Sequence, residues 1–561
     1  MVSACTVLLL LAVGAFAQVD EAKQAIERGE FVRAVNILTE ALTTRPSADV
    51  FLYLGIAYGN MKEYQKAEET LKQGADRYPD DARFHTELAG VYFAIHDVDS
   101  ARAELRRALS INSSDRYASD LLASIDMSRG DTETALKYWN KTQQPVIDDI
   151  LHNYYLNFGS SVVRDAVAFR PAGVLKYDDW KTTEARLFAT NNFVNVGLEV
   201  EPTRVPDRYD AIVRTSNKTN SLMDVLWNGV KGAPYQTTYL NFWNIGNSGV
   251  NWNSFYRWDG NRHGVNGRLQ LPLLIPGILQ VEFGEAWRSE RWDLTPTIRP
   301  QFAAEGSQVA YRGNGLDVSV KHIPHYRFEW GGGFAYTNRY AQGDIPQIAT
   351  NSLNAALFLA NTSVRLTDRS TYQNRLHVEG FLSRESLLSD FNFGGGTAEL
   401  NNRFTFSKPQ REYLDWTIKG GTSRGARPFE DYFMLGIDMH PPNLLGENLL
   451  RGHKLARHGR YGNGPTGTDF VLGNLDYERR LVTLPLFNTL NLPFVVLKAE
   501  VFLDSAKIWD RTDVFQNSKL LVDTGAGLKF ETPTGSLNVV YGRSLRDGQS
   551  VLLGYIERRI W

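Results

Sequence analysis

The last part of the chain, residues 494–561, begins with a segment whose side chains alternate in polarity. A β-strand has a side-chain period of two, so alternate residues point to opposite faces. One face here carries Lys498, Glu500, Phe502, Asp504 and Ala506, and the other carries Val495, Leu497, Ala499, Val501 and Leu503. A strand with an apolar outer face and a polar inner face is typical of a transmembrane β-barrel. We therefore expect this segment to form part of a barrel wall.

Similar segments follow one another from about residue 220 to the end of the chain. Examples are Gly267–Leu271, Gly315–Lys321 and Gln373–Ser383, with turn residues between them. At about 20 residues for each strand and its connection, about 340 residues give roughly sixteen strands, each with about ten residues in the membrane. No apolar run reaches the ~18–20 residues of a membrane helix. The prediction for residues 220–561 is an antiparallel transmembrane β-barrel of about sixteen strands.

Composition and the N-terminal residues indicate an exported protein. The formal charge of −2 argues against a nucleic-acid partner, which would favour a basic excess. An apolar run, Val7–Ala17, ends in Ala15-Phe16-Ala17, which predicts a signal peptide over residues 1–17. Cys5 is the only cysteine, so the mature protein would have neither disulfides nor cysteine-bound metal.

Residues 18–145 carry a repeat of about 34 residues with helical spacing. Alanines recur at equivalent positions, and a large apolar residue follows each of them by four: Ala34, Ala67, Ala101 and Ala135, then Leu38, Leu71, Leu105 and Trp139. Pro46 and Pro79 close the first two units. The pattern resembles the tetratricopeptide repeat, in which small alanines let paired helices pack closely. We expect an α-helical solenoid that docks a partner protein or peptide, with a rigid spacer as the alternative.

Residues 146–219 differ in character from the repeats. Val162-Val163 and Ala166–Phe169 indicate a short strand, Tyr177–Leu187 a helix, and Val194–Pro202 and Tyr209–Thr215 two further strands. This order resembles a POTRA domain, a small α+β module that precedes Omp85 barrels. Such a module implies a sheet edge to which a client strand can be added. The alternative is an inert hinge.

The C-terminal third carries further motifs in the order found in the Omp85 superfamily. They are Pro428–Gly436, Leu449-Leu-Arg-Gly-His453, Phe502-Leu-Asp504 with Trp509, Gly525-x-Gly527 running into Thr532-Pro533-x-Gly535, Tyr541-Gly542, and the final aromatic residue Trp561. The segment resembles an outer-membrane barrel of this family. Together the features predict a multidomain chain: an α-helical tetratricopeptide solenoid, a small α+β POTRA-like domain and a C-terminal barrel.

The resemblance also implies a specific contact inside the barrel. In the family, an Arg-Gly-aromatic loop tip folds back into the lumen, and its arginine pairs with an acid on the wall. Here that implies a pair between Arg451, followed by Gly452 and His453, and Asp504. A bidentate arginine–carboxylate pair would fix the loop in one orientation. Two residues depart from the family pattern: His453 replaces Phe or Tyr, and Ala506 replaces Gly.

Other chemistry is not indicated. Gly462-Asn-Gly-Pro-Thr-Gly467 fits a dinucleotide-binding pattern literally, but Pro465 lies within it and no strand–helix unit surrounds it, so we expect a loop. His453 and His458 have no nearby carboxylate cluster in sequence, so we predict no metal site there. We expect no cofactor, no catalytic site and no enzymatic activity.

The resemblance implies insertion or translocation of proteins at the outer membrane of a Gram-negative bacterium. The expected partners are the lipid bilayer, an unfolded or secreted client protein, and a periplasmic protein at the repeats. The barrel would close by pairing a strand near Tyr235–Trp243 with Val551–Trp561, and Gly554 would weaken this seam. A secretion pore for exopolysaccharide and a transporter of lipid on the same scaffold remain alternatives.

Overall fold

The computed structural model describes most of the chain after the predicted signal peptide. The described residues are 18–153, 161–218, 220, 222–233, 236–273, 277–294, 308–366, 370–406, 412–437, 449–457, 460–462, 464–485, 494–510, 518–532 and 535–557. They form two compact units, the first containing the helical repeats and the second the barrel. The small sheet of residues 146–217 contributes to both units. No helix in the described part of the chain combines the length and the hydropathy needed to cross a membrane.

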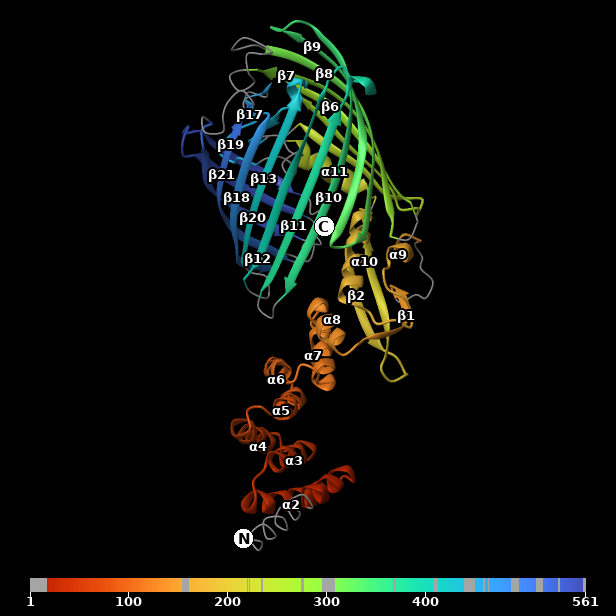
Figure 1. Ribbon diagram of the computed structural model, residues 1–561, viewed down its shortest axis with the longest axis vertical. Coiled ribbons are helices and arrows are strands. Elements are labelled where there is room, and N and C mark those ends of the chain that lie inside the picture. Colours follow the sequence, from red (N-terminus) through yellow and green to blue (C-terminus); the bar gives the residue numbers. More distant parts are fainter. Residues whose placement is uncertain are drawn as a thin grey trace, which may run out of the picture. The chain divides into compact units, whose positions relative to one another are not determined.

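The first unit is built of short helices packed in consecutive order (Figure 1). After a helix over residues 18–27 come α2 (Phe31–Thr44), α3 (Ala48–Asn60), α4 (Tyr64–Arg77), α5 (Ala82–Ala94), α6 (Val98–Ile111), α7 (Arg116–Ser128) and α8 (Thr132–Lys141). The repeat alanines at 34, 67, 101 and 135 are all fully buried. Asp97 and Asp131, which are 34 residues apart, both cap helix N-termini with their carboxylates. The sequence repeat is therefore also a repeat of packing and capping.

The small domain has the elements β1 (Val146–His152), α9 (Ser161–Ala166), α10 (Tyr177–Ala189), β2 (Phe193–Pro202) and β3 (Arg208–Asn217). The sheet order is β1-β3-β2, which leaves β1 and β2 at the edges. The helix and the last two strands were predicted correctly. The short strand predicted at Val162-Val163 was wrong, because these residues lie in α9. Both valines are buried together with Ala166, so the apolar residues cover one face of a single helical turn.

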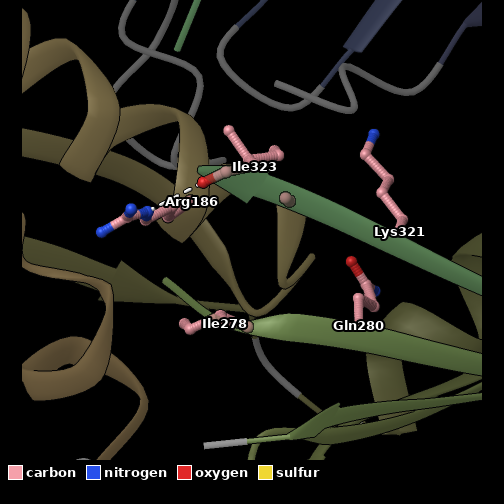
Figure 2. Close-up of a pocket in the computed structure, with 6 residues that line it drawn as sticks. Arg186, Ile278, Gln280, Lys321 and Ile323 are labelled. Carbon is pink, nitrogen blue, oxygen red and sulfur yellow. Dashed lines mark hydrogen bonds between the residues drawn. The ribbon is translucent and has the colours of Figure 1, made fainter. Parts of the chain in front are cut away.

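Helix α10 packs against the barrel inside the second unit. The Arg186 guanidinium donates hydrogen bonds to the carbonyls of Ile323 (3.0 Å) and Pro324 (2.7 Å), at the end of strand β8. Figure 2 shows the first of these bonds at a small pocket that Ile278 and Lys321 also line. The pocket has a volume of about 10 Å³, enough for about one water molecule. The contact therefore holds the helix in place and offers no room for a ligand.

The rest of the second unit is a closed antiparallel barrel (Figure 1). It starts after α11 (Leu222–Gly232), so the first residues of the predicted barrel region form a helix instead of a strand. The long strands are β4 (Thr237–Ile245), β5 (Val250–Asp259), β6 (Arg262–Leu273), β7 (Leu279–Asp293), β8 (Gln308–His325), β9 (Phe328–Gly343), β10 (Ile348–Leu366), β11 (Thr371–Ser383), β12 (Phe393–Thr405), β13 (Glu412–Gly425), β18 (Asp469–Pro485), β19 (Phe494–Trp509), β20 (Leu521–Thr532), β21 (Gly535–Ser544) and β22 (Ser550–Glu557). The prediction of about sixteen strands is confirmed.

The barrel closes where the last strand, β22, lies beside the first, β4, in the strand order. We call the boundary between these two strands the seam. The segment between β13 and β18, residues 426–468, is the crossing loop; it contains the short elements η3 (Phe429–Asp431), β14 (Phe433–Met434), β15 (Ala456–Arg457), β16 (Arg460–Tyr461) and β17 (Thr466–Gly467). A shorter connection between β11 and β12 contains η2 (Glu385–Leu387).

The alternation predicted for β19 is borne out by burial. Phe502, Asp504 and Ala506 are buried, whereas Val501 and Leu503 are exposed on the opposite face. Ala506 packs in an apolar cluster inside the wall with Leu472 and Leu521. The charged residues of this strand therefore point into the barrel.

Candidate functional site: the tip of the crossing loop

Arg451 lies inside the barrel and pairs with Asp504 of β19. The guanidinium donates from Nε to Oδ2 (2.9 Å) and from Nη2 to Oδ1 (2.6 Å), and the backbone N–H of Arg451 also donates to Oδ2 (2.9 Å). Asp504 is fully buried, and 8% of Arg451 is exposed. This is the fork-to-fork geometry of a strong arginine–carboxylate pair, and it fixes the main chain of the loop as well as its side chain.

Two more acids complete the surroundings of Arg451. Its Nη1 donates to Asp476 of β18 and to Glu500 of β19, the latter at 2.9 Å. The Asn474 amide bridges the wall and the loop, because its Nδ2 donates both to Asp504 (2.7 Å) and to the Leu449 carbonyl (2.9 Å). One guanidinium thus neutralises part of a group of three carboxylates, and those carboxylates in turn hold the loop.

The face of the guanidinium lies over the ring of Phe502, 3.7 Å from its centroid. A cation placed over an aromatic face is attracted by the ring quadrupole. Gly525 stands opposite Phe502 in the β19–β20 register. A Cβ at Gly525 would lie 2.4 Å from the Phe502 ring and 2.0 Å from the Tyr541 carbonyl oxygen. Gly525 therefore leaves the space in which the ring under Arg451 lies.

The next two residues of the loop bind the neighbouring strand. The Gly452 N–H donates to Oδ2 of Asp523 in β20 at 2.6 Å. The same oxygen lies 2.9 Å from His453 Nδ1, and His453 Nε2 lies 3.3 Å from Asp547. A Cβ on Gly452 would approach the Ser544 nitrogen to 2.5 Å. The glycine is required here because the loop backbone touches the wall.

The glycines of the remaining motifs have different surroundings. Gly542 faces the loop, since a Cβ there would lie 2.2 Å from the Arg451 carbonyl oxygen. Gly527 pairs with Val540 in β21. Gly554, in β22, has nothing within 4 Å of the place where a Cβ would stand.

The turn after β20 is described only in part. Thr532 ends β20, Gly535 begins β21 and the two residues are register partners. Pro533 and Trp561 lie outside the described residues, as does His458.

The literal dinucleotide pattern falls within the crossing loop, as expected. Gly467 belongs to β17, which pairs with β14 of the same loop. Gly462 has a positive φ and lies against the wall, where a Cβ would stand 2.5 Å from the Asp293 carbonyl oxygen. The described residues contain no group of three or more His, Cys, Asp or Glu side chains placed to hold a metal ion.

Sequence reasoning missed the acids that complete the site. Asp523 lies two residues before Gly525, and Glu500 was placed on the polar face without a role. A parity argument would have put both inside the barrel, but their contacts with the loop depend on the strand register.

The base of the crossing loop has a second buried ion pair that the sequence did not suggest. Arg339 of β9 pairs with Glu430 through Nε, and its Nη1 donates to Ser352 Oγ at 2.6 Å. Phe429 lies beside this pair against the rings of Trp292 and Tyr311. The loop is thus attached to the barrel wall at its base as well as at its tip.

Comparisons with known proteins find matches to the repeats and to a solved structure. The tetratricopeptide-repeat family model matches residues 25–86 and 62–125. Among solved structures, CdiB from Escherichia coli is similar with a TM-score of 0.51 and 11% sequence identity, over 74% of this chain and 76% of that chain. The barrel has the Omp85-type fold. No curated protein matches the sequence.

Two other solved structures are similar at lower scores. CdiB from Acinetobacter baumannii has a TM-score of 0.47 and 10% identity, over 81% of each chain. BamA from Haemophilus ducreyi lacking POTRA domains 1–3 has a TM-score of 0.44 and 11% identity, over 73% of this chain and 84% of that chain. The tetratricopeptide repeats that the sequence indicated are supported by the family model alone.

Proposed function

We propose that this chain is an outer-membrane protein that inserts, assembles or translocates client proteins. The observation that supports this most is the loop tip inside an Omp85-type barrel, where Arg451 is fixed on Asp504, Asp476 and Glu500. The charged, polar lumen and the apolar outer face suit a barrel that works in a lipid bilayer.

The physical basis of the activity would be the seam. A strand edge offers unpaired backbone donors and acceptors, which a client strand can use before it has a barrel of its own. β22 and β4 meet at the seam, and Gly554 of β22 has empty space where a side chain would stand. At this one position β22 has no side chain to unpack when it separates from β4.

The N-terminal part would bring clients or partners to the barrel. The order of β1, α9, α10, β2 and β3 supports the assignment as a POTRA-like domain, and its edge strands β1 and β2 offer places for β-augmentation. The repeats would recruit a periplasmic protein, since stacked helical repeats form extended binding surfaces.

Depletion of the protein in its own bacterium tests the proposal. We expect the amounts of other outer-membrane or surface-exported proteins to fall, measured by mass spectrometry of envelope and medium. Secreted polysaccharide and outer-leaflet lipid are measured in the same cultures. A loss of polymer or lipid with unchanged protein levels would favour the pore or the lipid transporter and contradict the proposal.

A second experiment tests the seam itself. Cysteine pairs are placed along β4 (Thr237–Ile245) and β22 (Ser550–Glu557) in a Cys5→Ser background. The purified full chain in liposomes is given a urea-denatured eight-stranded barrel protein, and insertion of that probe is followed by its resistance to protease. Oxidation of a pair that bridges the seam is expected to stop insertion, and reduction to restore it. Unchanged insertion by the cross-linked protein would refute opening at the seam.

A further inference from the structure

The crossing loop contacts the barrel wall on both sides of the seam. On the C-terminal side, Arg451 and His453 bind β19 and β20, as described above. The same part of the loop also touches the last strand itself. Ile437 and Leu449 pack with Val551 and Leu553 of β22 in a small apolar cluster. The loop therefore covers the strand that forms one side of the seam.

On the other side of the seam, the loop is held through Tyr461. Its backbone pairs with Trp292 of β7, and the two rings lie 5.4 Å apart. The guanidinium of Arg262, in β6, stands 4.5 Å from the centre of the Tyr461 ring. Arg257, in β5, donates from Nη1 to the Tyr461 hydroxyl at 3.5 Å. Tyr461 is 9% exposed, so it fills a site made by three of the first four strands of the barrel.

The chain between these two attachments is short. Residues 453 and 461 are eight positions apart, and eight residues reach at most about 29 Å even when fully extended. Between β20 and β7 lie β21, β22, β4, β5 and β6, so the two attachments are on strands on either side of the seam. If β22 separates from β4 while both attachments hold, the segment opposes the movement.

We propose that Tyr461 is a positioning residue that fastens the crossing loop over the seam, and that the seam opens only after Tyr461 leaves its site on β5, β6 and β7. This inference rests on the proposed function, because it assigns the step that must precede opening. It concerns the attachment on the β5–β7 side of the seam, whereas the Arg451–Asp504 pair is the attachment that stays in place.

The chemistry of the two attachments indicates which one releases. Arg451 is charged and shares hydrogen bonds with three carboxylates, and its withdrawal would leave Asp504 buried without its cation. Tyr461 is neutral. Its withdrawal exposes the ring and frees Arg262, which keeps Asp259 as a partner at 3.2 Å. Arg257 also keeps Asp259, at 3.7 Å, so the withdrawal of Tyr461 leaves no carboxylate without a cation and this attachment costs less to release.

The test locks and unlocks the Tyr461 site in the full chain. Trp292 and Tyr461 are register partners, so Trp292→Cys and Tyr461→Cys in a Cys5→Ser background bring two thiols together. The probe is the urea-denatured barrel protein used above. We expect loss of insertion after oxidation and recovery after reduction. Full insertion by the oxidised protein would overturn the proposal.

A matched pair controls for the presence of a disulfide. Asn314→Cys and Asn338→Cys join the register partners of β8 and β9, on one side of the seam only, and oxidation there should leave insertion unchanged. The β4–β22 cross-links separate this proposal from the proposed function. If they stop insertion and the Trp292–Tyr461 lock does not, the fastening role is wrong and the function stands. If neither stops insertion, opening at the seam is wrong as well.

A second variant addresses the case in which the cysteine pair does not fold. Tyr461→Ala is recorded in a planar lipid bilayer beside Tyr461→Phe, which keeps the ring over Arg262. We expect more frequent large-conductance openings in the alanine variant, with the phenylalanine variant close to wild type. A merely structural role would lower the yield of folded barrel without changing the opening frequency of the folded molecules, and that result would overturn the proposal.

Discussion

Gly525 and Phe502 are register partners in adjacent strands, and the ring of Phe502 occupies the space that a side chain at Gly525 would need. The guanidinium of Arg451 lies over the same ring, 3.7 Å from its centroid. The three residues form a stack that runs from the wall to the loop. A glycine in a strand thereby determines how a loop residue about seventy positions earlier is held.

Gly525→Ala should disturb this stack. The added Cβ would lie 2.0 Å from the Tyr541 carbonyl oxygen and 2.4 Å from the Phe502 ring, so backbone or ring must move. We expect a loss of about 1–3 kcal/mol in the free energy of unfolding, the usual cost of overpacking. Urea titration of the barrel in detergent, followed by tryptophan fluorescence, measures it. Gly554→Ala is the matched control, because nothing lies within 4 Å of its Cβ position. Equal effects of the two substitutions would contradict the steric argument.

Arg451→Ala should lower the free energy of unfolding more than the removal of an exposed arginine from the barrel does. It leaves fully buried Asp504 without a cation, and breaking a buried pair on one side typically costs about 3–5 kcal/mol. Arg403→Ala removes a pair with Asp415 in which the arginine side chain is 58% exposed, and such pairs contribute about 0–1 kcal/mol.

The same urea titration measures both variants. Arg451→Lys adds a third point, because lysine keeps the charge and loses the fork. We expect its stability to lie between that of wild type and that of Arg451→Ala. Wild-type stability of Arg451→Ala would show that the pair contributes nothing to the fold.

The sequence predictions that the structure bears out rest on two patterns, the alternation of side chains in a strand and the 34-residue repeat. The period of two in β19 placed Asp504 and Phe502 inside and Val501 outside, and burial agrees. The period of 34 placed the repeat alanines, because their packing depends on neighbours close in sequence. Both patterns involve residues that are close together in the chain, so they can be recognised in a single sequence without knowledge of the fold.

The contacts that sequence reasoning missed depend on long-range register. His453 meets Asp523 seventy residues later, and Tyr461 meets Arg262 about two hundred residues earlier. No local pattern records which strand a loop will touch. The strand predicted at Val162-Val163 was wrong although the signal was local. Two β-branched residues favour a strand, but here both valines are buried together with Ala166 in a short helix.

The repeats offer a test of close helix packing with two glycines in similar helical positions. A Cβ at Gly74, in α4, would lie 2.3 Å from the ring of Phe84 in α5, whereas a Cβ at Gly90 would meet nothing within 4 Å. Gly74→Ala should destabilise the repeats by about 1–3 kcal/mol through overpacking. Gly90→Ala should stabilise them by about 0.5–1 kcal/mol, because alanine favours the helix. Hydrogen exchange of the amides in residues 48–111 of the full chain measures both effects. The same sign for both would show that helix propensity, not packing, dominates.

His453 stands where the resemblance to Omp85 barrels predicts Phe or Tyr, and the structure indicates what the histidine contributes. His453 shares Oδ2 of Asp523 with the Gly452 N–H, and the other oxygen of Asp523 is buried without a hydrogen-bond partner in the described part of the chain. His453→Phe restores the aromatic ring and removes the hydrogen bond, so Asp523 is left with the backbone donor. We expect a loss of about 1–3 kcal/mol, the cost of an unsatisfied buried group.

Asp547→Asn is the control for His453→Phe. Asp547 lies 3.3 Å from the other ring nitrogen of His453, and its side chain is 39% exposed. Its effect should stay within about 1 kcal/mol, as for exposed pairs. Asp523→Ala and the double variant with His453→Phe complete a cycle, in which the double variant should cost less than the sum of the two single variants because the His453–Asp523 contact is lost only once. If His453→Phe alone is as stable as wild type, Asp523 is satisfied by Gly452 and the histidine serves only as a ring. If the double variant costs as much as the sum of the two single variants, the His453–Asp523 contact contributes nothing to stability.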